Sequence, residues 1–296
     1  MIDFLKYRGI VLIYSLVIFA GVVGLGFYRY QTRGSVFTYS VDFTGGTQIL
    51  MKFEKPVSAN ELKNILEAKG WTGTITREFA PQEIMVRVKE FENDSLGLAE
   101  RMKAAVIKAM PDSGATVLQS EAVGPGVGAE LRGNSVRAVL FALIALLFYI
   151  ALTFWSYSFA VGAVVALVHD AIVMLTFFMI FDRDISINVI AAILAVLGYS
   201  INDTIVIFSR IRGNLKKMRH IPLKDVVNTS LNQTLSRTIL TSFATSLSVI
   251  SMIIFGGEVL RDFSITLLIG IIFGTYSSIF IASPVMMVLH REEKAA

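Results

Sequence analysis

Six long runs of apolar residues, separated by more polar stretches, divide this chain of 296 residues. The runs are Gly9–Tyr28, Ala138–Trp155, Phe159–Phe181, Ile185–Phe208, Thr238–Phe255 and Phe263–Leu289. Each is close to or above the roughly 18 residues that an α-helix needs to cross a bilayer core. A segment inside a bilayer must satisfy its own backbone hydrogen bonds, so helices are the expected structure. The pattern therefore predicts an integral membrane protein with six transmembrane helices.

The stretch between the first two runs has a different pattern, typical of a small soluble domain. Its order is strand, helix, strand, strand, helix, strand, with the elements expected at Thr47–Phe53, Ser58–Lys69, Thr72–Glu78, Glu83–Val88, Leu96–Met110 and Thr116–Ser120. Ser58 and Glu61 have the spacing of a capping box at a helix start, and Gly70 suits the left-handed position after a helix. The order predicts a ferredoxin-like α+β (βαββαβ) domain.

These patterns predict a simple domain organisation. Residues 1–28 form an N-terminal transmembrane helix, 29–134 an exported α+β domain, and 135–290 a five-helix transmembrane bundle with a cytoplasmic loop at 209–237; a cytoplasmic tail covers 291–296. The first run follows Lys6 and Arg8, as in a signal peptide. It is longer than a signal-peptide core and no convincing cleavage site ends it, which favours an uncleaved signal anchor.

The distribution of basic residues predicts the orientation in the membrane. The segment between the fourth and fifth runs is rich in them: Arg210, Arg212, Lys216, Lys217, Arg219, Lys224 and Arg237. Both ends of the chain are also basic, with Lys6 and Arg8 at one and Arg291 and Lys294 at the other. Because short cytoplasmic loops are enriched in Lys and Arg, both termini and this segment are expected in the cytoplasm, and the α+β domain on the outer side.

Composition narrows the possible chemistry. The chain is 54% apolar and 17% charged, whereas soluble domains average about 45–50% and about 25%. It has no cysteine, so disulfides, thiolate metal sites and thiol nucleophiles are excluded. A Walker A loop, an HExxH motif and a GxGxxG after a strand are also missing from the sequence. We expect no cofactor, no metal and no enzyme activity. Acidic and basic residues are equal in number over 29–132, which argues against a nucleic-acid partner.

An ionisable side chain inside a membrane span is costly and usually functional. Asp203 lies in the fourth run among Ser200, Asn202 and Thr204, and Arg237 opens the fifth run. We interpret Asp203 as a carboxylate that binds and releases protons, with Arg237 as its counter-ion and the other three as polar neighbours. The alternative is a fixed ion pair that only orients helices. Arg237 could also extend to the cytoplasmic interface without pairing.

Other polar groups within the spans leave two interpretations open. His169 and Asp170 lie in the middle of the third run and could belong to a proton path or to a helix-packing hydrogen bond. Adjacent helical residues point about 100° apart, so at most one of them faces any single path. The hydroxyl-rich fifth run indicates either close packing or a hydrated lining beside Asp203. Gly270 and Gly274 form a GxxxG pair that indicates helix packing.

Four separated segments resemble the signature segments of the SecF family. They are Val41–Thr47 with Asp42, Gly45 and Gly46; Val123–Leu131 with Gly124 and Pro125; Gly198–Arg212 with Gly198 and Tyr199; and Thr234–Ser242. The resemblance extends from the first span to the last. The sequence departs from the family's usual pattern at Ser209 and Gly213. Both lie at the cytoplasmic end of the fourth span and affect the expected loop contacts more than the expected proton coupling.

The resemblance implies a subunit of the bacterial Sec export machinery, within the resistance–nodulation–division superfamily. It implies that Asp203 and Arg237 match the proton-conducting acid and its basic partner, and that the exported domain helps to draw preprotein outward at the expense of the proton-motive force. The implied partners are SecD as a heterodimer, the SecYEG translocon, YajC, YidC, the preprotein and membrane lipid. The implied location is the bacterial inner membrane.

Three rival functions remain at this point. The first is an ion-driven efflux pump of the same superfamily for lipids or small molecules. The second is an intramembrane aspartyl protease that uses Asp170 and Asp203, although the residues before Asp203 are Ser-Ile-Asn and not the Gly-x-Gly of that class. The third is a passive scaffold that tethers the translocase. The choice between H⁺ and Na⁺ is also open, because a carboxylate flanked by hydroxyls can bind either.

Overall fold

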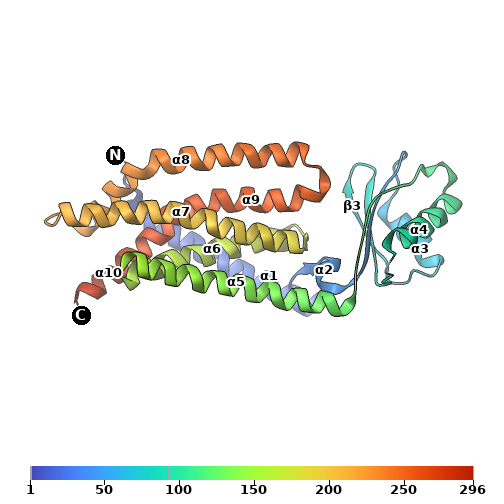
Figure 1. Ribbon diagram of the computed structural model, residues 1–296, viewed down its shortest axis with the longest axis horizontal. Coiled ribbons are helices and arrows are strands. Elements are labelled where there is room, and N and C mark those ends of the chain that lie inside the picture. Colours follow the sequence, from blue (N-terminus) through green and yellow to red (C-terminus); the bar gives the residue numbers. More distant parts are fainter. Residues whose placement is uncertain (1, 93, 296) are drawn as a thin grey trace. The chain divides into compact units, whose positions relative to one another are not determined.

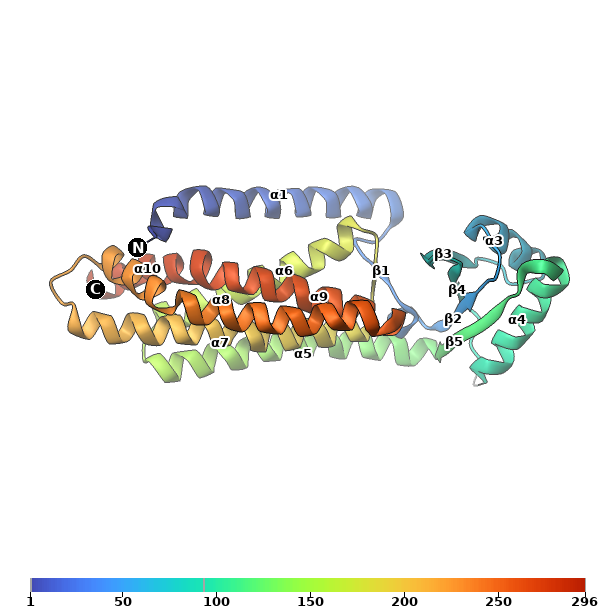
Figure 2. The same ribbon diagram turned by 90° about the horizontal axis from the view of Figure 1, so that it is seen from above.

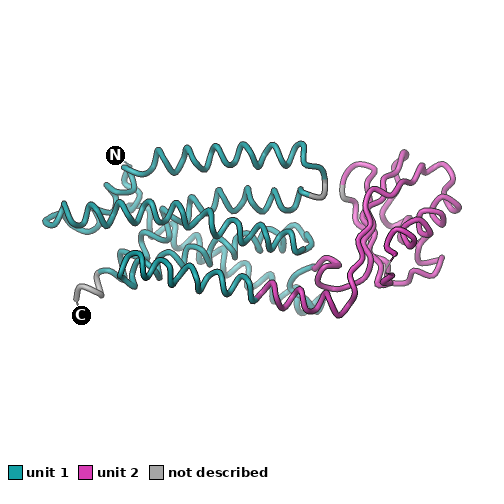
Figure 3. Tube along the Cα trace, in the orientation of Figure 1, with its two compact units in different colours: residues 1–38, 137–296 teal, residues 39–136 magenta. Residues whose placement is uncertain are grey.

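The computed structural model describes residues 2–92 and 94–295. Two compact units make up the chain, residues 1–38 with 137–296 and residues 39–136 (Figure 3). The predicted tail 291–296, with Arg291 and Lys294, lies outside the residues whose side chains are described. We call the first unit the membrane unit and the second the α+β unit.

The membrane unit is built from long helices. Their bounds are α1 (Arg8–Arg33), α5 (Pro125–Phe154), α6 (Tyr157–Ile180), α7 (Ile187–Lys217), α8 (Leu223–Phe255), α9 (Gly257–Ser277) and α10 (Ser283–Ala295). A 3₁₀ turn, η1 (Phe4–Tyr7), precedes α1, and a π-helical segment, η3 (Ser278–Ala282), joins α9 to α10. Six helical stretches among the described residues are long and apolar enough to cross a membrane. The predicted six-helix membrane architecture is confirmed.

Several helices extend beyond the apolar runs that marked them. Helix α7 continues to Lys217 and α8 begins at Leu223, so the predicted loop 209–237 is mostly helical and only 218–222 connects the two helices. Likewise α5 begins at Pro125, well before Ala138, and its first turns belong to the α+β unit. Hydropathy marks the part of a helix that lies in hydrocarbon, and charged residues continue the same helix into water.

The membrane unit has inner and outer helices. The buried share of the most apolar 18-residue stretch differs between spans. It is 50% in α6, in α7 and in the span formed by α9 and α10, but only 11% in α1, 6% in α5 and 11% in α8. The start of α1, the α7–α8 connection and α10 lie at one end of the bundle (Figures 1 and 2). The exposed apolar faces of α1, α5 and α8 are therefore available to lipid or to a partner protein.

The α+β unit contains a four-stranded antiparallel sheet of order β3-β4-β2-β5. The strands are β2 (Gly46–Lys52), β3 (Ile75–Ala80), β4 (Glu83–Val88) and β5 (Thr116–Val123), and the helices are α3 (Ala59–Ala68) and α4 (Ser95–Ala109). Both helices cover the same face of the sheet (Figure 1). Order and topology confirm the predicted ferredoxin-like fold.

A continuous apolar core joins the sheet to its two helices. Ile49 and Val86 from the sheet, Leu66 from α3 and Met102 from α4 are all fully buried in it. Ser58 is the residue before α3, as predicted, but its side chain makes no capping hydrogen bond, so that part of the prediction is wrong. Gly70 follows α3 with φ +106°, as expected of a glycine at that position.

The remaining elements are short. They are β1 (Thr38–Tyr39), α2 (Val41–Thr44), η2 (Pro111–Ser113) and β6 (Asp184–Ile185). The periodicity of the sequence does not reveal them, because an element of two to four residues is shorter than the window in which a period can be recognised.

Candidate proton-coupling site

Asp203 lies on the inner side of α7 and only 4% of its surface is exposed. Its Oδ2 accepts a long hydrogen bond, 3.5 Å, from Oγ of Ser242 on α8. The Ser242 hydroxyl in turn lies 2.6 Å from Oγ1 of Thr275 on α9. A line of polar groups thus crosses from α7 through α8 to α9. At its α7 end, the carboxylate of Asp203 accepts one weak hydrogen bond among the described residues. Such an acid can change protonation without breaking a strong network.

Arg237 is not paired with Asp203 in this structure. Its side chain is exposed on α8, and no ion pair within 4.0 Å joins the two among the described residues. Ser242, which contacts Asp203, lies five positions after Arg237 and therefore about 140° around the helix and about 7.5 Å along it. The charge of Arg237 nonetheless acts on Asp203 through space. The predicted counter-ion is near the acid but separate from it.

The three predicted neighbours of Asp203 point elsewhere. Asn202 is exposed on the outer side of α7. Ser200 donates to Asp170 on α6, and Thr204 lies 2.8 Å from the Ser278 hydroxyl at the start of η3. The prediction that these residues surround Asp203 is wrong. Positions one before, three before and one after a helical residue leave the helix at angles of about 60–100° from it, and here those directions lead to other helices.

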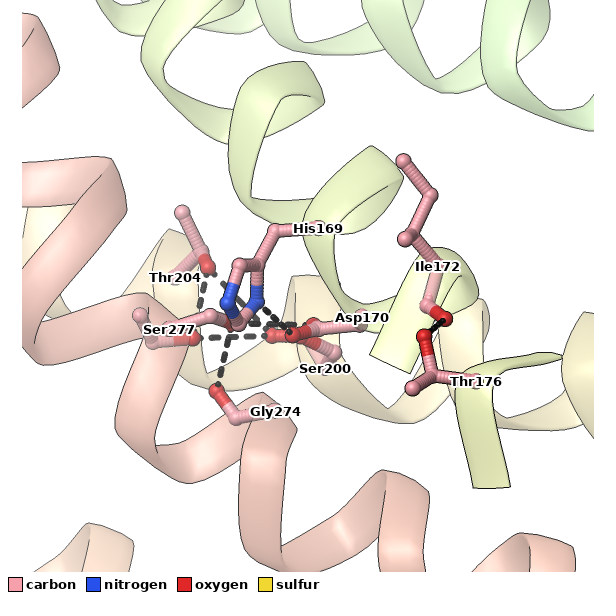
Figure 4. Close-up of polar contacts among 9 residues, drawn as sticks. His169, Asp170, Ile172, Thr176, Ser200, Thr204, Gly274 and Ser277 are labelled. Atoms are coloured by element: carbon pink, nitrogen blue, oxygen red, sulfur yellow. Dashed lines mark hydrogen bonds and ion pairs between the residues drawn. The ribbon is translucent and has the colours of Figure 1, made fainter. Parts of the chain in front are cut away.

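Asp170, the acid in the third apolar run, is the centre of a cluster of polar side chains in the membrane unit (Figure 4). It is fully buried, and its Oδ2 accepts hydrogen bonds from Ser200 Oγ at 2.7 Å and Ser277 Oγ at 2.9 Å. Its Oδ1 lies 3.3 Å from Nδ1 of His169. The imidazole of His169 thus turns back toward the neighbouring carboxylate, although adjacent helical residues point about 100° apart. Helices α6, α7 and α9 are joined by this one acid.

Two glycines allow these helices to approach one another. A Cβ on Gly274 would lie 3.0 Å from the Ser200 side chain and 3.6 Å from Asp170 Oδ2, and a Cβ on Gly270 would overlap Val196. The predicted packing role of this GxxxG pair is thus borne out at the α7–α9 contact. Tyr199, on another side of α7, donates to Thr245 of α8 at 3.2 Å.

Most hydroxyls of α8 serve their own helix. Thr241, Thr245, Ser248 and Ser251 donate to the carbonyl four residues earlier. Ser242 and Thr245 are the members that also bond a neighbouring helix. Close packing with local hydrogen bonds describes this run better than a continuous hydrated lining.

An ion-pair cluster at the end of the bundle where α6 meets α7 was missed by the sequence reasoning. Asp182 accepts from Arg29 at 2.9 Å, Arg33 at 3.0 Å and Thr38 at 3.1 Å. Burial opposes ionisation of Asp182, but the hydrogen bonds of Arg33 and Thr38 and the positive charges of Arg33 and Arg29 prevail, so the pKa of Asp182 lies below its ordinary value. The sequence signal was the charged triplet 182–184, whose partners lie far away in the chain.

Comparison with known proteins gives the family. The family model described as "Protein export membrane protein SecD/SecF, C-terminal" matches residues 102–292, and the "SecD/SecF GG Motif" matches residues 35–57. The protein translocase subunit SecF of Calditerrivibrio nitroreducens is 44% identical over 82% of this chain and 81% of its own length. This chain belongs to the SecD/SecF family.

Structural similarity extends over nearly the whole chain. The crystal structure of SecDF from Thermus thermophilus has a TM-score of 0.86 at 37% identity, and covers 98% of this chain and 39% of the SecDF chain. SecDF in a super-membrane-facing form has a TM-score of 0.70 at 36% identity and covers 99% of this chain. The chain thus spans little more than a third of the SecDF relatives and most of the length of the SecF relatives. Six apolar helices and family membership make it a multi-pass inner-membrane protein.

The SecD/SecF GG motif has a packing role in the α+β unit. Gly45 and Gly46 both have positive φ, +73° and +108°. A Cβ on Gly45 would lie 2.6 Å from Cα of Pro125, and one on Gly46 would collide with the Val88 carbonyl. The motif therefore brings the segment after α2 against the start of α5, where Gly124 and Pro125 stand. Asp42 accepts a hydrogen bond from Ser40 at 2.9 Å in the same turn.

The geometry does not support a protease dyad. Asp170 and Asp203 bind different hydroxyl groups, and no hydrogen bond between them is found in the part of the chain that the structure describes. An aspartyl protease needs two carboxylates that share one proton. SecD/SecF proteins are named as export membrane proteins and translocase subunits, which is not an enzyme class. No cluster of three or more metal-binding side chains occurs among the described residues.

Proposed function

We propose that this chain is a SecF-type subunit that works with SecD and uses the proton-motive force to promote late stages of preprotein translocation across the inner membrane. Its relatives are named as protein translocase subunits, which favours protein export over an efflux pump. The single observation that supports the coupling role is Asp203, a carboxylate buried between α7 and α8 with one long hydrogen bond.

In this proposal, Asp203 is the group that alternates between charged and neutral forms. When charged, it is attracted toward Arg237, and when protonated it loses that attraction, so the two forms favour different arrangements of α7 and α8. Each elementary charge that crosses 100 mV releases about 2.3 kcal/mol, so several protons are needed for one large movement of the α+β unit. The separation of Arg237 from Asp203 corresponds to the form without the ion pair.

The orientation follows from the positive-inside rule. Both termini and the basic α7–α8 connection are proposed to face the cytoplasm, and the α+β unit, residues 39–136, the outer side. The start of α1, that connection and α10 lie at the same end of the bundle, as this topology requires (Figure 1). We also propose the division into an N-terminal transmembrane helix (1–28), an exported α+β domain (29–134) and a five-helix transmembrane bundle (135–290).

The proposed partners follow from the family. A relative named SecDF joins both parts in one chain, and this chain corresponds to 35% of it, which supports association with SecD as a separate chain here. The SecDF crystal structure is described as that of a translocon-associated membrane protein, which supports contact with SecYEG. YajC and YidC complete the proposed assembly. The work is mechanical, with no covalent chemistry and no cofactor.

The test is preprotein export into vesicles that contain this chain and SecD, under an imposed proton gradient. Asn keeps the size of Asp203 but cannot titrate, so Asp203→Asn is expected to abolish the gradient-dependent part of export while the complex still assembles. Asn202→Ala, on the exposed side of the same helix, is the matched control and should export normally.

Three results would contradict the proposal. Unchanged export with Asp203→Asn would make the acid structural and the subunit a scaffold. Gradient-driven loss of a hydrophobic dye from the vesicles would favour an efflux pump. Export that follows a sodium gradient with no response to protons would identify Na⁺ as the coupling ion.

A further inference from the structure

The buried acid Asp170 accepts hydrogen bonds from two hydroxyl groups and contacts the imidazole of His169. Ser200 and Ser277 present their hydroxyls to Oδ2, and His169 presents Nδ1 to Oδ1 (Figure 4). A carboxylate accepts from all three at once, whereas a carboxylic acid would have to donate one of these bonds itself. Because Nδ1 of His169 can donate or accept, the contact fits two proton positions: on Nδ1 with Asp170 charged, and on Oδ1 with Asp170 neutral.

The His169 ring also lies against two aromatic side chains of other helices. The ring contacts Phe19 of α1, with centroids 5.9 Å apart, and Tyr276 of α9, at 6.1 Å. In the form with the imidazole proton on Nδ1, Nε2 is an acceptor, and no hydrogen bond to it occurs among the described residues. Ser15 is one helical turn before Phe19 and is thus on the same side of α1.

Two buried hydroxyls on α1 and α9 have no hydrogen-bond partner within the described part of the chain. They are Oγ of Ser15, whose residue is 7% exposed, and Oη of Tyr276. Ser15 is close enough to act on the Tyr276 hydroxyl, although the two do not complete a hydrogen bond of good geometry. Buried hydroxyls are normally satisfied, and a buried water is stable when two to four polar groups surround it. Ser15, Tyr276 and Nε2 of His169 provide three.

We propose that Ser15, Tyr276 and His169 hold a water molecule between α1, α6 and α9, and that this water delivers protons to the His169–Asp170 pair. This site is distinct from Asp203 and does not require that Asp203 be the coupling acid. A hydronium ion at the water position gives its proton to Nε2 of His169 and becomes water. The Nδ1 proton then moves to Oδ1 of Asp170, which leaves a neutral imidazole with its proton on Nε2 and a neutral carboxylic acid.

The groups around the His169–Asp170 pair determine what this proton transfer changes. The titratable neighbours are Tyr276 on α9 and, beyond it, Tyr14 on α1, while α7 and α9 present the hydroxyls of Ser200 and Ser277. No cation of Lys or Arg forms an ion pair with Asp170 among the described residues, so its charge is balanced only by hydrogen bonds and His169. Protonation removes the charge that holds α6, α7 and α9 together, beside the π-helical segment η3.

Infrared difference spectroscopy of the full chain in lipid nanodiscs tests the proposal. As the pH is lowered, the C=O stretch of protonated Asp170 should appear as a band that is lost in Asp170→Asn and kept in Asp203→Asn, and protonated Asp203 should give a separate band that only Asp203→Asn removes. If Asp170→Asn leaves the spectrum unchanged, the proposal is overturned. If only Asp203→Asn removes a proton-dependent band, the His169–Asp170 site is overturned and the proposed function stands. If only Asp170→Asn removes a proton-dependent band, the His169–Asp170 site stands and the coupling role of Asp203 is overturned.

A second pair of variants keeps the test informative if Asp170→Asn does not fold. Tyr276→Phe and Ser15→Ala remove only the hydroxyls without partners, and both should slow the appearance of the Asp170 band after a pH jump. The matched controls are Tyr149→Phe, exposed on α5, and Ser248→Ala, which bonds only its own helix. Rates equal to those of the controls would show that no proton passes this way.

Discussion

Gly274 shows how single residues set the spacing of the inner helices. The atoms opposite it are the Ser200 side chain and, slightly farther, the carboxylate of Asp170. A methyl group there would push α9 away from α7 and stretch the hydrogen bonds that Ser200 and Ser277 donate to Asp170. Gly198 is a glycine of the neighbouring helix with no atom near its absent side chain. The two positions therefore differ in what they tolerate, although both are glycines within helices.

Substitution of Gly274 by Ala is expected to destabilise the protein by about 1–3 kcal/mol, because insertion of a methyl group into a close contact forces backbone shifts. Gly198→Ala, the matched control, is expected to leave stability unchanged or raise it, since Ala favours helix by about 1 kcal/mol. Thermal unfolding in detergent measures both. Equal midpoints for the two variants would mean that α7 and α9 are not packed as described.

Prediction from sequence was most successful for elements and least for the directions of polar side chains. The apolar runs located all six spans, and the alternation in residues 47–120 located the sheet and its helices. The pattern could not show that Ser200 points to Asp170 and away from Asp203, because a rotation of one position along α7 changes which helix a side chain meets. Nor could the pattern show that Arg237 and Asp203 are separate in this structure, since their ion pair remains a prediction for the charged form of the acid. The cluster at Asp182 depends on residues about 150 positions away, which no local pattern reports.

At the scale of elements, Asp182 joins the last turn of α1 to the turn between α6 and α7. Asp182→Asn is expected to lower stability at neutral pH by about 0.2–1 kcal/mol, the range for partly exposed ion pairs after screening by solvent. Its folded pKa is depressed, so its contribution is present above the unfolded pKa of about 3.9 and is lost as the pH falls through the folded value.

The measurement is unfolding of the wild type and Asp182→Asn as a function of pH. The free energies of unfolding of the two proteins should differ at neutral pH and become equal in acid, and high salt should reduce the difference. The control is Asp112→Asn, which removes an ion pair with Lys55 in which both side chains are exposed. A difference between wild type and Asp182→Asn that persists unchanged at low pH would rule out an electrostatic role.

The whole molecule divides into two compact units. The α+β unit has its own core of buried residues drawn from the sheet and both of its helices. A protein divided in this way can hold one unit steady in lipid while the other is displaced in water, since the stability of each is internal to it. That division is what a mechanical export subunit would require.

A fragment of residues 39–136 is therefore expected to fold in water and to unfold cooperatively on heating. In that fragment Leu66→Ala should cost about 2–5 kcal/mol, because it leaves a cavity in a filled core. Leu118→Ala, exposed on β5, should change stability by less than about 0.5 kcal/mol. Circular dichroism as a function of denaturant gives both values. Absence of a cooperative transition in the fragment would show that the unit depends on the membrane helices.

The π-helical segment at 278–282 has a consequence for how the last span tolerates change in length. Such a turn accommodates one residue more than an α-helical turn, and the Ser283 hydroxyl bonds the Ser278 carbonyl across it. Loss of one residue here would restore ordinary helix and leave the rest of the span facing the same neighbours, so buried Met286 would stay against Gly162. The last span can therefore carry this one residue or lose it without a change in which side chains beyond it are buried.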